Sequence, residues 1–271
     1  MFDLNDLEAT RQLVSTAAAQ ELMTRFESVV ADTKADGSLI TEADLAMQQR
    51  LQAELAARWP QFALLGEEME AVEQQALLAS PGRGLWCLDP LDGTSNFAAG
   101  IPFFAVSLAL IVDGAVYAAV VYDPARDECF SALRGQGAWL NGRRLRAPAT
   151  PETLREAMAM VDLKRLPEPL VRALARQSPY RSQRSFGSVA LDWCWIAAGR
   201  CQVYLHGGQR LWDYAAGQRV LVESGAVGGL LDDYRGDWLS ALSLHPRIAV
   251  AATHPGLLAQ WRSWLASGLR G

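Results

Sequence analysis

Four acidic residues of this 271-residue chain stand where apolar segments end, in positions that suit metal binding. They are Glu67, Asp89, Asp92 and Asp213. Pro90 holds Asp89 in an extended conformation and prevents a helix, so one turn can direct Asp89 and Asp92 at the same point. Carboxylates gathered at one point repel one another unless cations neutralise them. Oxygen ligands without histidine or thiolate favour Mg²⁺, with Mn²⁺ or Ca²⁺ as competitors.

The residues after Asp92 have the composition of a helix start. The order is Gly93-Thr94-Ser95-Asn96, and the free amides and the dipole at a helix N-terminus favour a phosphate. An Asp-Gly pair also occurs in ordinary turns, so this pair alone has a purely structural explanation. Carboxylates beside an anion-binding helix end favour the chemical interpretation, in which metal ions hold a phosphate.

Three motifs together resemble the signatures of the inositol monophosphatase family of metal-dependent, lithium-sensitive phosphatases. They are GEE at 66–68, DPLDGTSNF at 89–97 and WDYAAG at 212–217. The segments GIPFFAVSLAL, RGQGAWLNGRRL and RSFGSVALDWCWIAAG are also similar to that family and occur in its order. The resemblance extends from about Lys34 to Gly225. It implies a layered αβαβα sandwich, of mixed α+β and α/β character.

The resemblance also implies a role for individual residues. The metal ligands would be the four carboxylates and one backbone carbonyl, namely Glu67, Asp89, Leu91, Asp92 and Asp213. The phosphate would contact Asp92, Gly93 and Thr94. The substrate alcohol would contact Gly187, Ser188, Val189 and His206. The expected cofactor is Mg²⁺, with two or three ions per site, Mn²⁺ as an alternative and inhibition by Li⁺.

Asp44 has two competing interpretations. The segment 41–44, TEAD, fits a capping box in which Asp44 only closes a helix N-terminus. The local pattern favours that cap, whereas the resemblance of DGSLITEAD to the family favours catalysis. In the catalytic interpretation Glu67 and Thr94, with Asp44 behind Thr94, orient a water for in-line attack, and no covalent phosphoenzyme forms. Lys34, just upstream, is either a polar neighbour of the site or a solvated lysine.

His206 departs from the family pattern. Members that act on inositol phosphate carry a glutamate seven residues before the WD aspartate, where this chain has His206 in an expected loop. A histidine offers different hydrogen bonds from a carboxylate. The substitution therefore directs attention to histidinol phosphate, a sugar phosphate or 3′-phosphoadenosine 5′-phosphate as well as inositol phosphate. The alternative is a solvated histidine with no role in substrate binding.

The expected activity is hydrolysis of a small phosphorylated alcohol by a Mg²⁺-dependent phosphomonoesterase. A function of another class is a regulatory protein, since some bacterial members act partly by binding transcription machinery. The intact metal-ligand pattern argues against a protein that only regulates. The resemblance also implies a homodimer.

Helices and strands must bring these distant residues together. Apolar periodicity predicts helices over 3–30, 42–58 and 168–177, and in SVALDWCWIAAG, DYAAGQRVLVESG and PGLLAQWRSWL. Strands are predicted in FALLGEE, GLWCLD, EAMAMVD, CQVYLH and RIAVAA, with a hairpin over 103–122. We expect an N-terminal lobe, residues 1–146, with helices on a largely antiparallel sheet and most metal ligands. A C-terminal α/β lobe, residues 147–271, would complete the site.

Composition limits the remaining classes of function. Half of the residues are hydrophobic and the net charge is −5, which allows a large core and argues against general nucleic-acid binding. No apolar run is long enough to predict a membrane span, and the N-terminus lacks the pattern of a signal peptide. The four cysteines form no CxxC pair, so we expect buried free thiols in a cytoplasmic protein.

Overall fold

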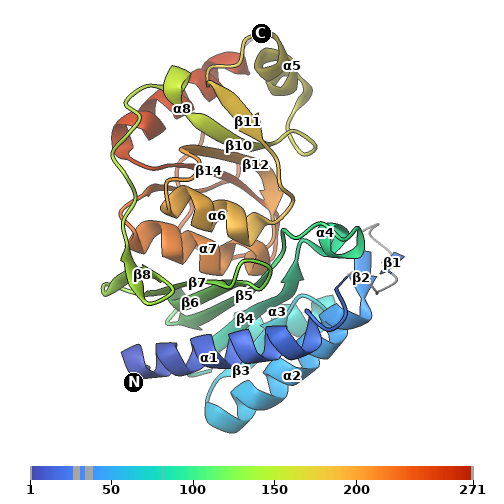
Figure 1. The fold of residues 1–271 in the computed structure, drawn as a ribbon. Helices are drawn as coiled ribbons and strands as arrows, with labels where there is room; N and C mark the ends of the chain where they lie inside the picture. The colour runs from blue at the N-terminus through green and yellow to red at the C-terminus, as the bar shows by residue number, and fades with distance from the viewer. Residues whose placement is uncertain (1, 27–30, 34–38, 81, 270–271) are drawn as a thin grey trace.

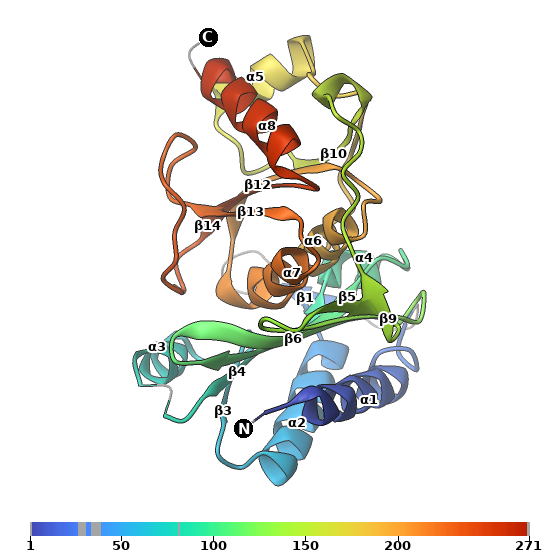
Figure 2. The same ribbon diagram turned by 90° about the vertical axis from the view of Figure 1, so that its left-hand side faces the viewer.

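The fold has five layers, in which three layers of helices alternate with two β-sheets. This is a computed structural model, and it describes residues 2–26, 31–33, 39–80 and 82–269. Figure 2 shows α1 and α2 below the first sheet, α6 and α7 between the sheets, and α5 and α8 beyond the second. The predicted αβαβα sandwich is therefore confirmed.

The helices span the following residues: α1 Leu4–Glu21, α2 Glu42–Arg58, α3 Ala71–Ala79, α4 Thr94–Ala98, α5 Glu168–Arg176, α6 Val189–Ala197, α7 Leu211–Glu223 and α8 Pro255–Gly268 (Figure 1). A short 3₁₀ helix covers Leu154–Glu156. The predicted helix at 42–58 is confirmed at both ends. The first helix is shorter than predicted, because the Met23 amide bonds to the Ala18 carbonyl five residues back and ends the regular spiral. Its predicted last residues, 27–30, lie outside the described ranges.

The first sheet contains seven strands within the described residues, in chain order. They are β3 Ala63–Gly66, β4 Leu85–Asp92, β5 Ala105–Val112, β6 Ala115–Asp123, β7 Glu128–Leu133, β8 Gly137–Leu140 and β9 Arg143–Leu145. Only the β3–β4 pair is parallel among them. The predicted hairpin turns at Asp113 and Gly114, whose φ angles are +51° and +70°. A pair of left-handed residues matches the twist of the flanking strands.

The second sheet has the order β11-β10-β12-β14-β13 among the described residues. Its strands are β10 Met158–Asp162, β11 Ser182–Arg184, β12 Val203–Gln209, β13 Val227–Leu231 and β14 Arg247–Ala252. A separate small ladder joins β1 Ala31–Thr33 to β2 Leu39–Thr41. His206 lies inside β12, so the loop predicted there is wrong. The strand continues through Gly207 and Gly208 to Gln209 because β14 accommodates an irregular register at this point.

The two central helices are tightly packed against each other and place their N-termini together. α6 is buried on nearly all sides, as its apolar sequence predicts. A Cβ atom on Gly217 of α7 would come within 2.7 Å of the Trp193 Cβ, so glycine permits this close approach. The last strand of the first sheet ends at residue 145, and the first strand of the second sheet begins at residue 158. The division of the chain into two lobes, residues 1–146 and 147–271, remains a proposal.

Two further expectations concern single residue types and long apolar segments. The four cysteines are free and buried, as predicted. Among the described residues, no helix has the length and apolar character needed to cross a membrane.

Candidate active site

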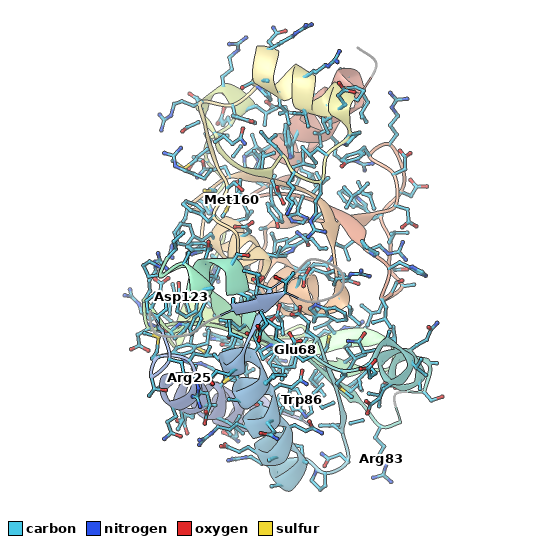
Figure 3. The ribbon with its side chains drawn as sticks, turned by 90° about the vertical axis from the view of Figure 1, so that its right-hand side faces the viewer. Arg25, Glu68, Arg83, Trp86, Asp123 and Met160 are labelled. Atoms are coloured by element: carbon cyan, nitrogen blue, oxygen red, sulfur yellow. The ribbon has the colours of Figure 1, made fainter. Side chains whose placement is uncertain are left out.

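A cavity of about 370 Å³ lies where elements of both sheets meet. In Figure 3 the labelled Glu68 lies at a height between Met160 of β10 and Trp86 of β4. The cavity is lined by eleven of the twelve residues that the sequence predicted for the site: Glu67, Asp89, Leu91, Asp92, Gly93, Thr94, Gly187, Ser188, Val189, His206 and Asp213. The twelfth, Asp44, lies behind Thr94. Lys34 lies outside the described residues.

The end of β4 presents two of the carboxylates. The register of β4 against β5 shifts between Asp89 and Asp92, at Pro90, and the strand bends there. The Leu91 amide donates to Asp89 Oδ1 over 3.0 Å. Asp89 is 2% exposed and Asp92 is 8% exposed. These two carboxylates are thus held beside the cavity and almost withdrawn from water.

The loop that carries Glu67 is fixed by two glutamines. Gln74 of α3 donates from Nε2 to the carbonyls of Gly66 and Glu67, over 2.8 and 3.1 Å. The Glu68 amide donates to Gln48 Oε1 of α2 over 3.2 Å. Sequence reasoning missed both glutamines, because neither belongs to a motif and α3 was not anticipated.

The turn from β4 into α4 requires a glycine. Gly93 has a φ of +101°, and a Cβ there would lie 3.1 Å from the Phe103 carbonyl oxygen. The amides of Asn96 and Phe97 bond back to the Gly93 carbonyl, so α4 begins at Thr94 as the sequence suggested. The preceding amides lie outside the hydrogen bonds of the helix. The residues of this turn, Gly93, Thr94 and Ser95, line the cavity.

Asp44 makes both of the contacts that the sequence presented as alternatives. Its Oδ2 accepts from the Thr41 amide over 2.7 Å and from Thr41 Oγ1 over 2.6 Å, which completes a capping box for α2. Its Oδ1 accepts from Thr94 Oγ1 over 3.1 Å. Thr94 Oγ1 also lies 3.0 Å from the Leu91 carbonyl, so its single proton has two acceptors. The cap therefore orients the carboxylate that holds Thr94.

Asp92 connects the end of β4 to the start of α6. Its Oδ2 accepts from Ser188 Oγ over 2.6 Å and from the Ala190 amide over 2.7 Å, both at the start of α6. Asn96 of α4 adds a second link by donating to the Phe186 carbonyl over 2.7 Å. The sequence suggested that Ser188 contacts substrate, but it did not reveal this bond to Asp92.

Asp213 belongs to the first turn of α7. Its Oδ2 accepts from the Arg210 amide over 2.8 Å, and so it closes the helix N-terminus. Ser107 of β5 donates to the neighbouring Trp212 carbonyl over 2.9 Å. This bond ties the start of α7 to the first sheet, beside β4.

Burial and mutual repulsion disfavour negative charge in this part of the cavity. Burial raises the pKa of Asp89 and Asp213 well above their usual range, and Glu67 and Asp92 raise both further. Burial also raises the pKa of Asp92, to about 6, against the lowering effect of its bonds to Ser188 and Ala190. Bound cations would relieve exactly this kind of repulsion, so the all-oxygen donor set suits Mg²⁺. Within the described ranges, no group of three or more histidine, cysteine, aspartate or glutamate side chains is arranged so that it could hold a metal ion as it stands.

His206 of β12 is paired with Asp162 on the neighbouring strand β10. Its Nε2 lies 3.1 Å from Asp162 Oδ2, and the Gly208 amide donates to its Nδ1 over 3.2 Å. His206 is 6% exposed, so it is not a solvated histidine.

Comparisons with known proteins agree over most of the chain. The model of the Inositol monophosphatase family matches residues 3–265. The chain is 36% identical over 224 residues to the Nus factor SuhB of Pseudomonas aeruginosa, with 78% of each chain covered. It is 36% identical over 207 residues to the inositol-1-monophosphatase of Mesorhizobium japonicum, with 75% of each covered. The structure of the Thermotoga maritima IMPase is similar with a TM-score of 0.83 at 26% identity, covering 98% of this chain and 99% of that one.

Proposed function

Since the chain belongs to the inositol monophosphatase family, we propose that it is a Mg²⁺-dependent phosphomonoesterase acting on a small phosphorylated alcohol. The observation that carries this proposal is the shared cavity. Four carboxylates and the turn into α4 line the same 370 Å³ space. A phosphate there would have cations on one side and backbone amides on the other.

Glu67, Asp89, Asp92, Asp213 and the Leu91 carbonyl would hold the cations, two or three per site, with Mn²⁺ as an alternative to Mg²⁺. When bound, such cations stabilise charge on phosphate oxygens and lower the pKa of a coordinated water. The raised pKa values of the buried aspartates support this assignment, because a cation favours their charged forms. Inhibition by Li⁺ is part of the same proposal.

Thr94, Asp44 and Glu67 would orient the attacking water. Thr94 Oγ1 donates its proton toward Asp44 Oδ1, 3.1 Å away, so its oxygen lone pairs remain available to accept from a water. Because the Thr41 cap fixes Asp44, this acceptor for the Thr94 hydroxyl is in place before substrate arrives. Glu67, held at the end of β3, would accept from the same water. Gly93 and Thr94 would contact the phosphate together with Asp92.

The alcohol would lie toward Gly187, Ser188, Val189 and His206. Inositol phosphate is the first candidate, as in the inositol-1-monophosphatase relative. Histidinol phosphate, a sugar phosphate and 3′-phosphoadenosine 5′-phosphate are the alternatives. We also propose a cytoplasmic homodimer, on family grounds.

A second candidate function is regulatory. The Pseudomonas aeruginosa relative is named a Nus factor, which favours a role in binding transcription machinery beside or instead of catalysis. Pull-down of purified RNA polymerase with this protein tests it. Retention of polymerase by the catalytically impaired Asp92→Asn protein would support a role independent of turnover, and no retention by either protein would oppose one.

The test of the enzymatic proposal is phosphate release from a panel of phosphomonoesters with and without Mg²⁺. Release from at least one small alcohol phosphate that depends on Mg²⁺ is the expected result. No release from any ester with Mg²⁺ or Mn²⁺ would overturn the proposal.

A further inference from the structure

We propose that Asp162, held in place by His206, is the residue that recognises hydroxyl groups of the substrate alcohol. This inference rests on the proposed phosphatase function and specifies its substrate class. The expected substrate is the phosphate ester of a neutral polyhydroxy alcohol. His206 would then be a positioning residue, in contrast to the direct contact that the sequence suggested.

The strand register brings the pair together. β10 and β12 are parallel neighbours, and Asp162, the last residue of β10, is directly opposite His206 in the middle of β12. Gly207 follows His206, and a Cβ atom there would collide with the Arg165 carbonyl oxygen. Only glycine lets the segment after β10 pack so closely on β12. The position of Asp162 is therefore fixed by backbone packing as well as by its side chain.

Hydrogen bonding defines the proton on His206. The Gly208 amide donates to Nδ1 over 3.2 Å, so Nδ1 must carry a lone pair. The proton of the neutral imidazole is then on Nε2, which lies 3.1 Å from Asp162 Oδ2 and donates to it. In this tautomer both ring nitrogens are engaged by the protein, and His206 has no remaining polar atom for a ligand.

Asp162 retains capacity for a ligand. The Lys164 amide donates to its Oδ1 over 2.9 Å, so each carboxylate oxygen has one protein donor and can accept another hydrogen bond. The side chain of Asp162 is 26% exposed, whereas that of His206 is 7% exposed. The hydrogen bond from His206 lowers the pKa of Asp162, so the carboxylate is charged at neutral pH. Of the two residues, Asp162 is therefore the one that a ligand in the cavity would contact.

The charges nearby favour a neutral donor over an ammonium group. Lys164 and Arg165 follow Asp162 closely in the chain and line the same cavity. Asp192 also lines it, but burial raises its pKa well above the usual range, which disfavours its charge. One charged carboxylate beside two cationic residues gives no net attraction for a positively charged alcohol. A hydroxyl can donate to Asp162 without that electrostatic cost.

Three matched six-membered rings test this assignment: inositol 1-phosphate with hydroxyls, cyclohexyl phosphate with none, and 4-aminocyclohexyl phosphate with an ammonium. The wild-type kcat/KM should be highest for inositol 1-phosphate. Asp162→Asn should lower the kcat/KM ratio of inositol 1-phosphate to cyclohexyl phosphate by roughly ten- to a hundredfold, the range for losing a charged hydrogen bond. Asp237→Asn, at an exposed aspartate outside the cavity lining, is the matched control and should leave the ratio unchanged.

Two substitutions of His206 test its positioning role. The amide of Gln reaches where Nε2 lies and can donate to Asp162, whereas Asn mimics Nδ1 and cannot reach it. His206→Asn should therefore lower the kcat/KM ratio of inositol 1-phosphate to cyclohexyl phosphate. His206→Gln should keep much of the wild-type ratio. Equal losses in both variants would overturn the positioning role. ¹⁵N NMR of histidine-labelled protein adds a readout without catalysis: the Nε2–H tautomer is expected, and the Nδ1–H tautomer would contradict it.

The outcomes separate this inference from the function on which it rests. If the wild type releases phosphate from none of the ring esters or other phosphomonoesters, the proposed function fails and the inference fails with it. If it hydrolyses the ring esters but Asp162→Asn leaves the ratio unchanged, only the inference is overturned. A wild-type preference for 4-aminocyclohexyl phosphate over inositol 1-phosphate would contradict the neutral polyhydroxy class.

Discussion

The two ends of the cavity treat their carboxylates in opposite ways. At the end formed by β4 and α7, burial raises the pKa of Asp89 and Asp213, and neighbouring carboxylates raise it further. At the other end, a hydrogen bond from His206 lowers the pKa of Asp162. The protein itself stabilises the charge of Asp162, whereas it leaves the carboxylates at the first end, Asp89 and Asp213 among them, repelling one another. This difference supports our proposal that cations bind at the first end, whereas a hydrogen bond within the protein stabilises the charge of Asp162.

The largest effect should come from removing a ligand charge at the first end. Asp92→Asn can still accept bonds from Ser188 and Ala190, so the fold should persist. Because metal-based charge stabilisation contributes several kcal/mol, kcat should fall by about 10³-fold or more. Steady-state kinetics at saturating Mg²⁺ measure this, with circular dichroism as the control for folding. Near-normal Mg²⁺-dependent activity would show that the metal end is misassigned.

The next effect separates the two contacts of Asp44. Asp44→Asn weakens the acceptor for Thr94, and kcat should fall by about 10²-fold, the lower range for a positioned base. Thr41→Ala is its partner variant, since it removes the hydroxyl of the cap but keeps the Thr41 amide that donates to Asp44 Oδ2. Because that amide still orients Asp44, the free energy of unfolding should fall by about 1 kcal/mol with kcat little changed. If Asp44→Asn loses thermal stability but keeps its kcat, Asp44 is only a helix cap.

A smaller effect, on stability, is expected from weakening the hydrogen bond between Ser188 and Asp92. Ser188 Oγ donates to Asp92 Oδ2 over 2.6 Å between two buried residues. Ser188→Ala leaves that acceptor with one bond fewer, so the free energy of unfolding should fall by about 1–3 kcal/mol. Urea denaturation with and without Mg²⁺ measures it. A stability equal to that of the wild type would argue against this bond as a stabilising link between β4 and α6.

The smallest effect concerns pH in metal-free protein. The pKa of Asp92 is raised to about 6 from its model-compound value of 3.8. A raised pKa in the folded state stabilises the fold at low pH, and this stabilisation is lost as pH rises through about 6. The Tm in EDTA should therefore decrease between pH 5 and pH 7 relative to the Tm with Mg²⁺. Parallel pH profiles in EDTA and Mg²⁺ would contradict the proposed repulsion.

Local signals in the sequence predicted how residues of the proposed metal end of the cavity are positioned. The capping box of α2, the Asp-Pro turn of β4 and the glycine before α4 all lie within a few residues of the groups they place. The hairpin of the first sheet could be predicted in the same way, because its turn has left-handed residues at Asp113 and Gly114.

The end of the cavity that we propose for the alcohol could not be predicted in this way. Asp162 meets His206 only because β10 and β12 become neighbours in the second sheet. The strand predicted in CQVYLH stopped at His206, which was assigned to a loop, whereas β12 continues to Gln209. The bond between Ser188 and Asp92 joins residues 96 positions apart. Contacts of this kind depend on tertiary packing and leave no periodic or local pattern in the sequence.

The most direct test of the central claim is phosphate release from inositol 1-phosphate by one enzyme preparation taken through three states. The protein is assayed with Mg²⁺, then after removal of divalent cations with EDTA, and then after Mg²⁺ is restored. We predict release in the first state, loss in the second and recovery in the third. Release that is unaffected by chelation would contradict the assignment of Glu67, Asp89, Asp92 and Asp213 as the residues that hold the catalytic cations.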